Sequence, residues 1–112
     1  MRIFRDFAEF KAAVGTEIGL SDWIDVIQER IDQFAVATGD DQWIHVDVAR
    51  AERDSPTGTT IAHGLLTLGL APIFLRAVVD LERVTNTLNY EANRIRFLGP
   101  DAGRLTAAPQ LQ

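Results

Sequence analysis

The feature that most limits the possible folds is an apolar run at residues 62–79. Its large apolar side chains cover most of a helix circumference rather than one stripe: Leu65, Leu66, Leu68, Leu70, Ile73, Phe74, Leu75, Val78 and Val79. A helix with this pattern is expected to be buried on nearly every side, at the centre of its domain. As one helix it would measure about 27 Å, although Pro72 lacks a backbone N–H and is expected to bend or interrupt it.

Length and composition favour one small domain that spans residues 1–112. The chain has 112 residues, of which 46% are hydrophobic, so a single core is feasible but self-association would help to stabilise it. The net charge of -5 and the single lysine, Lys11, argue against a nucleic-acid partner. The lack of cysteine excludes a disulfide framework, a zinc ribbon and a thiolate nucleophile.

Charge placement argues against a secretory signal and a membrane span. Arg2, Arg5, Asp6 and Glu9 interrupt the first ten residues, which therefore lack the apolar centre of a signal peptide. The uncharged apolar stretch at residues 64–75 is shorter than the ~20 residues that a spanning helix needs. We therefore expect a cytoplasmic protein with no membrane partner.

Short-range patterns predict an α+β chain. Bulky and branched residues favour a strand at residues 23–27, and alternation favours strands at 88–91 and 94–97, with another opening at Leu105. Apolar spacing predicts helices at residues 4–11, 28–38 and 46–53. Gly39 is expected to end the second helix, and residues 54–58 are expected to form a turn.

A candidate acid–base site follows the predicted helix at residues 28–38. Asp40 precedes His45 by five residues in a polar loop, where both side chains could contact the same water molecule, and His63 and Gly64 stand at the head of the apolar run. On spacing alone, a solvated histidine in a helix-end turn is the alternative. His63 has a structural alternative, in which its ring bonds a loop carbonyl.

A metal site is a further alternative for the same side chains. Asp40, His45 and His63 supply two imidazoles and one carboxylate, which are ligand types that suit zinc or iron. The spacing does not match the His-x-x-x-His pattern on one helix face. We therefore expect no metal.

The residues around the candidate site resemble a known family. The stretch Thr38-Gly39-Asp40-Asp41-Gln42-Trp43-Ile44-His45-Val46-Asp47, with Ala62-His63-Gly64 further on, is similar to MaoC-like dehydratases, the R-specific enoyl-CoA hydratase group of the hotdog fold. Asp-Gln-Trp-Ile-His resembles the variant of the nodulation-protein-N-like branch, where many relatives have Asn-Pro. The resemblance covers roughly residues 23–97.

The resemblance implies a fold in which a curved antiparallel β-sheet wraps around a long central apolar helix. Members of the family usually continue for a few tens of residues and add further strands. The resemblance therefore implies a single hotdog domain that lacks its last strands, receives them from a partner or remains incomplete. It also implies a homodimer whose sheets join edge to edge.

The activity implied by the resemblance is reversible hydration of trans-2-enoyl thioesters to R-3-hydroxyacyl thioesters. Asp40 and His45 would together carry the acid–base catalysis, and the sequence leaves open which of them transfers which proton. Gly64, Gln42 and His63 would bind the substrate and its thioester oxygen. No metal or redox cofactor is implied, since coenzyme A or an acyl carrier is part of the substrate. An acyl-thioesterase on the same fold and a non-catalytic module that acts through dimerisation are the alternatives.

Overall fold

The computed structural model describes residues 1–99 and the backbone of residues 104–105. Within these residues the chain forms two compact units. The first unit contains Met1–Asp22 and Ala71–Arg96, and the second contains Trp23–Leu70 with residues 97–99 and 104–105. Both units contain helices and strands, as expected for an α+β chain.

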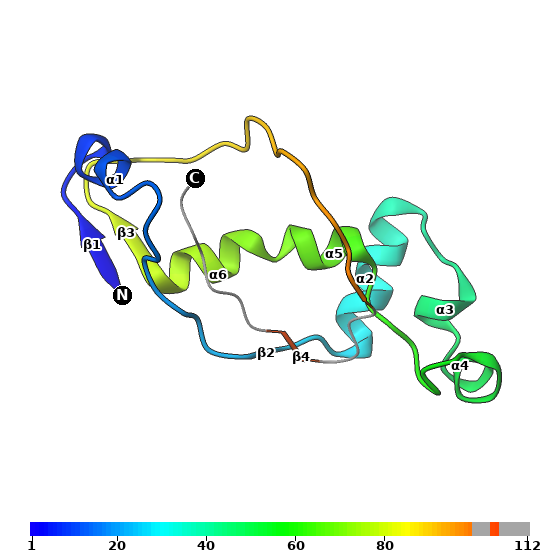
Figure 1. The fold of residues 1–112 in the computed structure, drawn as a ribbon. Coiled ribbons are helices and arrows are strands. Elements are labelled where there is room, and N and C mark those ends of the chain that lie inside the picture. The colour runs from blue at the N-terminus through cyan, green and yellow to red at the C-terminus, as the bar shows by residue number, and fades with distance from the viewer. Residues whose placement is uncertain (100–103, 106–112) are drawn as a thin grey trace. The chain divides into compact units, whose positions relative to one another are not determined.

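The first unit is built on a parallel pairing that the sequence did not predict. Strand β1 (Arg2–Phe4) pairs with β3 (Val79–Leu81), which follows helix α6 (Ala71–Val78), and Figure 1 shows the two strands side by side. Helix α1 (Phe7–Ala12) is capped by the preceding Asp6, whose Oδ1 accepts a hydrogen bond from the backbone N–H of Glu9 at 2.9 Å. The predicted helix at residues 4–11 is therefore present, but it starts later because residues 2–4 form a strand. The unit's core contains Phe4, Ala13, Ile18, Val78 and Val79.

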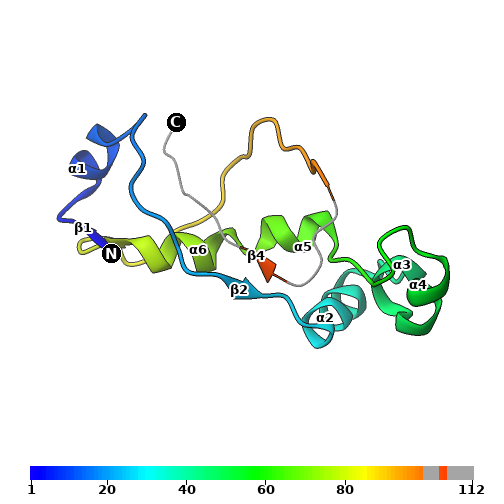
Figure 2. The same ribbon diagram turned by 60° about the horizontal axis from the view of Figure 1, so that its bottom comes forward.

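The second unit places three helices in close succession. Helix α2 (Gln28–Thr38) has the predicted bounds, and it is followed by α3 (Trp43–Val46) and α4 (Val48–Asp54). Figure 2 shows α3 and α4 packed side by side. The predicted strands around residues 24 and 105 are confirmed as β2 (Ile24–Asp25) and β4 (Arg104–Leu105), which pair in antiparallel fashion.

The long helix predicted at residues 62–79 is interrupted. Helix α5 (Gly64–Gly69) ends at Leu70, and α6 begins at the next residue. Pro72 lies in the first turn of α6, where it has no N–H to donate to the carbonyl four residues earlier. The interruption expected at Pro72 is therefore confirmed. Within residues 1–99, no helix has both the length and the apolar character needed to cross a membrane.

Several apolar side chains of residues 62–79 are exposed, which contradicts the prediction that a helix here is buried on nearly every side. Leu65 is 63% exposed, and Leu68, Ile73 and Leu75 are 38%, 39% and 41% exposed. The strands in the described part of the chain are only two or three residues long, which is too short to form a sheet that covers such a surface. The prediction of a helix buried on nearly every side is therefore wrong within the described residues.

The predictions of strands at residues 88–91 and 94–97 are also wrong. No strand forms at either place, and Leu88 and Tyr90 are 89% and 95% exposed. An alternating pattern becomes a strand only when a partner strand satisfies its backbone, and none of the described strands pairs with this segment. The antiparallel sheet around a central helix stays a prediction.

Candidate active site

The segment that carries Asp40 and His45 begins where helix α2 ends. Gly39 adopts a left-handed conformation with φ of 81°, and its N–H bonds the carbonyl of Ala35 at 2.8 Å. The chain then enters α3, where the N–H of His45 donates to the carbonyl of Gln42 at 3.0 Å. His45 therefore lies on a short helix, which corrects the predicted loop. A four-residue helix is too short to show the apolar periodicity that sequence analysis relies on.

The ring of His45 is held by a backbone carbonyl. The residue is 7% exposed, and its Nδ1 lies 2.8 Å from the carbonyl oxygen of Ile61. A carbonyl oxygen can only accept, so Nδ1 carries a hydrogen and donates it. In the neutral ring, Nε2 is then the nitrogen that can accept a proton. The two segments are joined a second time by the N–H of Ile61, which donates to the carbonyl of Ile44 at 3.0 Å.

His63 holds the backbone of Asp40. The ring is 2% exposed, and its Nε2 lies 2.8 Å from the Asp40 carbonyl oxygen, so Nε2 carries a hydrogen and donates it. The other nitrogen, Nδ1, is buried and has no hydrogen-bond partner among the described residues. His63 therefore fixes the position of Asp40 through the main chain, as the structural alternative for this residue requires.

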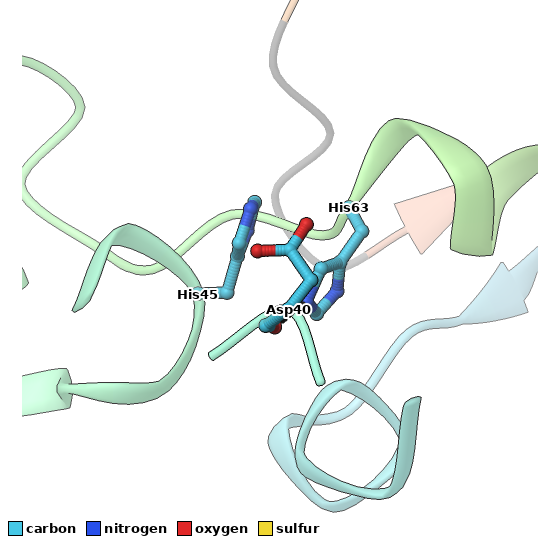
Figure 3. A group of neighbouring side chains, drawn as sticks. All are labelled: Asp40, His45 and His63. Atoms are coloured by element: carbon cyan, nitrogen blue, oxygen red, sulfur yellow. Dashed lines mark hydrogen bonds between the residues drawn. The ribbon is translucent and has the colours of Figure 1, made fainter. Parts of the chain in front are cut away.

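These contacts bring the three side chains together. Figure 3 shows the Asp40 carboxylate beside the side chains of His45 and His63. A carboxylate oxygen and one nitrogen from each ring all lie within 4.8 Å of one another. The two imidazoles stack with their centroids 3.9 Å apart, and Phe34 packs against His63 with a centroid distance of 4.6 Å. Sequence and structure thus agree on the proximity of Asp40 and His45.

The orientation of the rings does not fit a metal ion. An imidazole nitrogen presents its lone pair in the plane of the ring. The rings of His45 and His63 are stacked and lie within 24° of parallel, so their lone pairs lie in two nearly parallel planes. They do not converge on a point about 2.0–2.1 Å from both nitrogens, as a zinc ion would require. As placed, the three side chains suit proton transfer better than metal binding.

Two further residues support His45, and sequence analysis missed both. The side-chain Nε2 of Gln28 donates to the backbone carbonyl of His45 at 2.7 Å, and its Oε1 accepts a hydrogen bond from Thr60 Oγ1 at 2.6 Å. These partners are 17 and 32 residues from Gln28. No local pattern connects residues at such separations, so the sequence held no signal that would have found them.

Gln42 and Gly64 lie next to the cluster but make weaker or different contacts. The Nε2 of Gln42 is 3.5 Å from Asp40 Oδ1, a long hydrogen bond, and the Gln42 side chain is exposed. Gly64 is the first residue of α5, and a Cβ added there would lie 2.8 Å from Cγ of Phe97. The ring of Phe97 therefore lies on the side of this glycine where a side chain would stand.

Comparison with known proteins identifies the family. Residues 9–100 match the family model described as MaoC like domain. The chain belongs to this family. All the residues of the candidate site, namely Asp40, Gln42, His45, His63 and Gly64, fall within the matched range of this MaoC-like domain.

Two kinds of curated relatives resemble this MaoC-like domain. A protein named 3-hydroxyacyl-thioester dehydratase Z, from Mycobacterium tuberculosis, is 46% identical over 100 residues, which cover 89% of this chain and 66% of the relative. Nodulation protein N from Rhizobium leguminosarum bv. viciae is 45% identical over 94 residues, covering 83% of this chain and 58% of the relative. Nodulation protein N from Rhizobium meliloti is 42% identical over the same length and shares. The chain thus spans 66% or less of the length of these relatives.

Proposed function

We propose that this MaoC-like domain catalyses the reversible hydration of trans-2-enoyl thioesters to R-3-hydroxyacyl thioesters. The observation that carries the proposal is the proximity of the Asp40 carboxylate to the imidazole of His45, with their polar atoms within 4.8 Å. A water molecule that makes hydrogen bonds of about 2.8 Å to two groups places them roughly 4.5 Å apart. The two side chains are thus suitably spaced to hold one water. The name of the mycobacterial relative, 3-hydroxyacyl-thioester dehydratase Z, describes the reverse of this reaction.

In the proposed mechanism His45 takes the proton of the water. Its Nδ1–H is committed to the Ile61 carbonyl, so Nε2 is the nitrogen that can act as the base. As Nε2 takes the proton, the water oxygen bonds to C3 of the substrate and the electrons of the double bond move towards the thioester oxygen. Asp40 orients the same water. The Asp40–His45 pair then returns one proton to C2, which completes the addition of H and OH.

The negative charge that develops on the thioester oxygen needs a hydrogen-bond donor. We assign this role to the backbone N–H of Gly64, which stands at the start of α5 and has no acceptor within its own helix. Gln42 is assigned to the substrate site because its side chain approaches the Asp40 carboxylate. His63 is assigned to the same site as the residue that fixes the Asp40 backbone.

The proposal also covers the fold, assembly, substrate and location of the domain. We assign it the hotdog arrangement, in which an antiparallel sheet surrounds the apolar helical segment, and a homodimer as its assembly. The described strands are too short to form this sheet, so the proposal requires further strands. The substrate is the thioester of coenzyme A or of an acyl carrier, and the mechanism requires no metal or redox cofactor. The cytoplasm is the proposed location.

Loss of the enoyl-thioester absorbance on mixing the protein with crotonyl-CoA tests this function. Asp40→Asn keeps the shape of the side chain but removes the carboxylate charge, and His45→Ala removes the base. Each is expected to lower turnover by roughly 10²- to 10⁴-fold. Asp41→Asn is the matched control, because this neighbouring carboxylate is exposed and should leave turnover within about twofold of the parent.

The product distinguishes the proposed reaction from its alternatives. An R-3-hydroxyacyl product without release of free thiol is the expected result. Release of free thiol would show hydrolysis of the thioester instead. Undiminished hydration by a folded Asp40→Asn protein would overturn the assignment of the catalytic pair.

A further inference from the structure

We propose that Gln28 and Thr60 are a positioning pair that sets the orientation and tautomer of the His45 ring. The kinetic part of this inference rests on the proposed function, whereas the part that concerns the tautomer does not. The observation behind it is a set of hydrogen bonds that connects the Gln28 amide to the backbone of His45 and to Thr60, the residue before Ile61, whose carbonyl accepts the Nδ1–H of His45.

The orientation of the Gln28 amide is fixed by its neighbours. Its Nε2 lies 2.7 Å from the carbonyl oxygen of His45 and 2.9 Å from Oδ1 of Asp32. Both of these oxygens accept hydrogen bonds, so the nitrogen of the amide must face them. The remaining oxygen, Oε1, then faces Thr60 and accepts its hydroxyl hydrogen at 2.6 Å. Both N–H donors and the carbonyl of this amide are therefore used.

These bonds form a closed path through the site. Gln28 holds the carbonyl of His45, and through Thr60 it also holds the residue next to Ile61. The carbonyl of Ile61 accepts the Nδ1–H of His45. Together with the hydrogen bond from the N–H of Ile61 to the carbonyl of Ile44, this side chain holds the histidine and the carbonyl that selects its tautomer at a fixed distance.

The amide is well placed to act as a rigid support. Gln28 is the first residue of α2, an 11-residue helix that is anchored by buried Ile31 and Ala35. Thr60 is 9% exposed, so water competes little for its hydroxyl group. The stacking contact with His63 does not choose between the two ring nitrogens of His45. The choice depends on the Ile61 carbonyl, and hence on the pair that holds this segment in place.

Kinetics of Gln28→Met test the catalytic consequence. Methionine has nearly the length of glutamine but neither donates nor accepts as the amide does, so the His45 carbonyl and the Thr60 hydroxyl lose their partner, and only the backbone bond from Ile61 to Ile44 still joins the two segments. We expect kcat to fall roughly 10- to 100-fold, with KM within about twofold, because the base is misplaced while the substrate contacts remain. Gln33→Met is the matched control, since it makes the same change at an exposed position of the same helix. An unchanged kcat in the folded Gln28→Met protein would overturn the catalytic consequence.

The tautomer of His45 provides a readout that does not depend on turnover. Two-bond ¹H–¹⁵N correlation spectra, recorded at a pH where the imidazoles are neutral, distinguish a hydrogen on Nδ1 from one on Nε2. We expect the Nδ1–H form in the parent protein and in Gln33→Met, and a mixture of both forms in Gln28→Met. A pure Nδ1–H form in Gln28→Met would show that the pair does not set the tautomer, whether or not the protein is a hydratase.

Thr60 supplies a second pair of variants that decides the question if Gln28→Met does not fold. Thr60→Val keeps the shape of the side chain and removes the hydroxyl group, whereas Thr60→Ser keeps the hydroxyl group and removes a methyl group. We expect Thr60→Val to show the mixed tautomer and the lower kcat, and Thr60→Ser to restore both. Equal behaviour of these two variants would mean that packing, and not the hydrogen bond to Gln28, is what matters at this position.

Discussion

His45 and His63 stack with their ring centroids 3.9 Å apart, and each ring bonds the segment that carries the other. His45 donates to the carbonyl of Ile61, two residues before His63, and His63 donates to the carbonyl of Asp40, five residues before His45. The two segments are therefore cross-linked by a pair of reciprocal hydrogen bonds. One nitrogen of each ring is committed to structure. The remaining two are Nε2 of His45, the base of the proposed mechanism, and Nδ1 of His63, which is buried and has no hydrogen-bond partner among the described residues.

Replacement of His63 by phenylalanine separates its structural role from the role of His45. His63→Phe keeps an aromatic ring against His45 but removes the hydrogen bond to Asp40, so unfolding in urea should show a loss of about 1 kcal/mol. Turnover should also fall, because the Asp40 backbone is no longer fixed. Phe34→Leu, which alters the neighbouring ring contact and no hydrogen bond, is the control. Full turnover in folded His63→Phe would mean that Asp40 keeps its position without this bond.

Gly39→Ala and Gly69→Ala make the same substitution at two different backbone conformations, left-handed at Gly39 and helical at Gly69. Gly39→Ala forces alanine into a left-handed conformation with φ of 81°, which should destabilise the protein by about 1–2 kcal/mol. Gly69→Ala lies in helix α5, where an added Cβ meets nothing within 4 Å, and it should be neutral or stabilising by up to about 1 kcal/mol. Both changes restrict the unfolded chain equally, so the difference in urea midpoints isolates the effect of the folded backbone. Equal midpoints would contradict the assigned backbone conformation of Gly39.

The parts of the fold that could be predicted depend on neighbouring residues. Helix α2 was predicted with its observed bounds because the apolar spacing and Gly39 mark its body and its end. The break near Leu70 was predicted because Pro72 has no N–H. In each case the physical cause lies within a few residues of the feature.

The parts that could not be predicted depend on residues far apart in the sequence. The parallel pairing of β1 with β3 joins Arg2 to Val79, and the amide of Gln28 joins Thr60 to His45. Conversely, residues 88–97 alternate like strands but form none, because an alternating pattern cannot supply its own partner strand. For the candidate site, the sequence indicated Asp40, His45 and His63, while the stacking of the rings and the support from Gln28 required the structure.

Acid sensitivity of the first unit should depend in part on Glu9. Its Oε2 accepts hydrogen bonds from the backbone N–H of Arg5 at 2.9 Å and from Arg5 Nε at 3.3 Å, and these contacts lower the pKa of the Glu9 carboxyl. A lowered pKa means that the contribution to stability is present above the ordinary pKa of glutamate and is lost as the pH falls through the lowered value. The stability difference between the parent and Glu9→Gln should therefore be present at neutral pH and disappear in acid. Glu52→Gln, at another exposed glutamate, is the control, and a difference that persists in acid would contradict the prediction.

The close approach of Phe97 to Gly64 predicts coupled effects of substitution at these two positions. A Cβ at Gly64 would lie 2.8 Å from Cγ and 2.9 Å from Cδ1 of the ring, so Gly64→Ala should displace the ring or the start of α5. Phe97 is 54% exposed and has room to move, which places the expected cost near the lower end of the range for overpacking, about 1 kcal/mol. In Phe97→Ala the obstacle is absent, so adding Gly64→Ala should then cost little. Urea unfolding of the parent, the two single variants and the double variant measures this coupling, and strictly additive changes would show that the two residues do not touch.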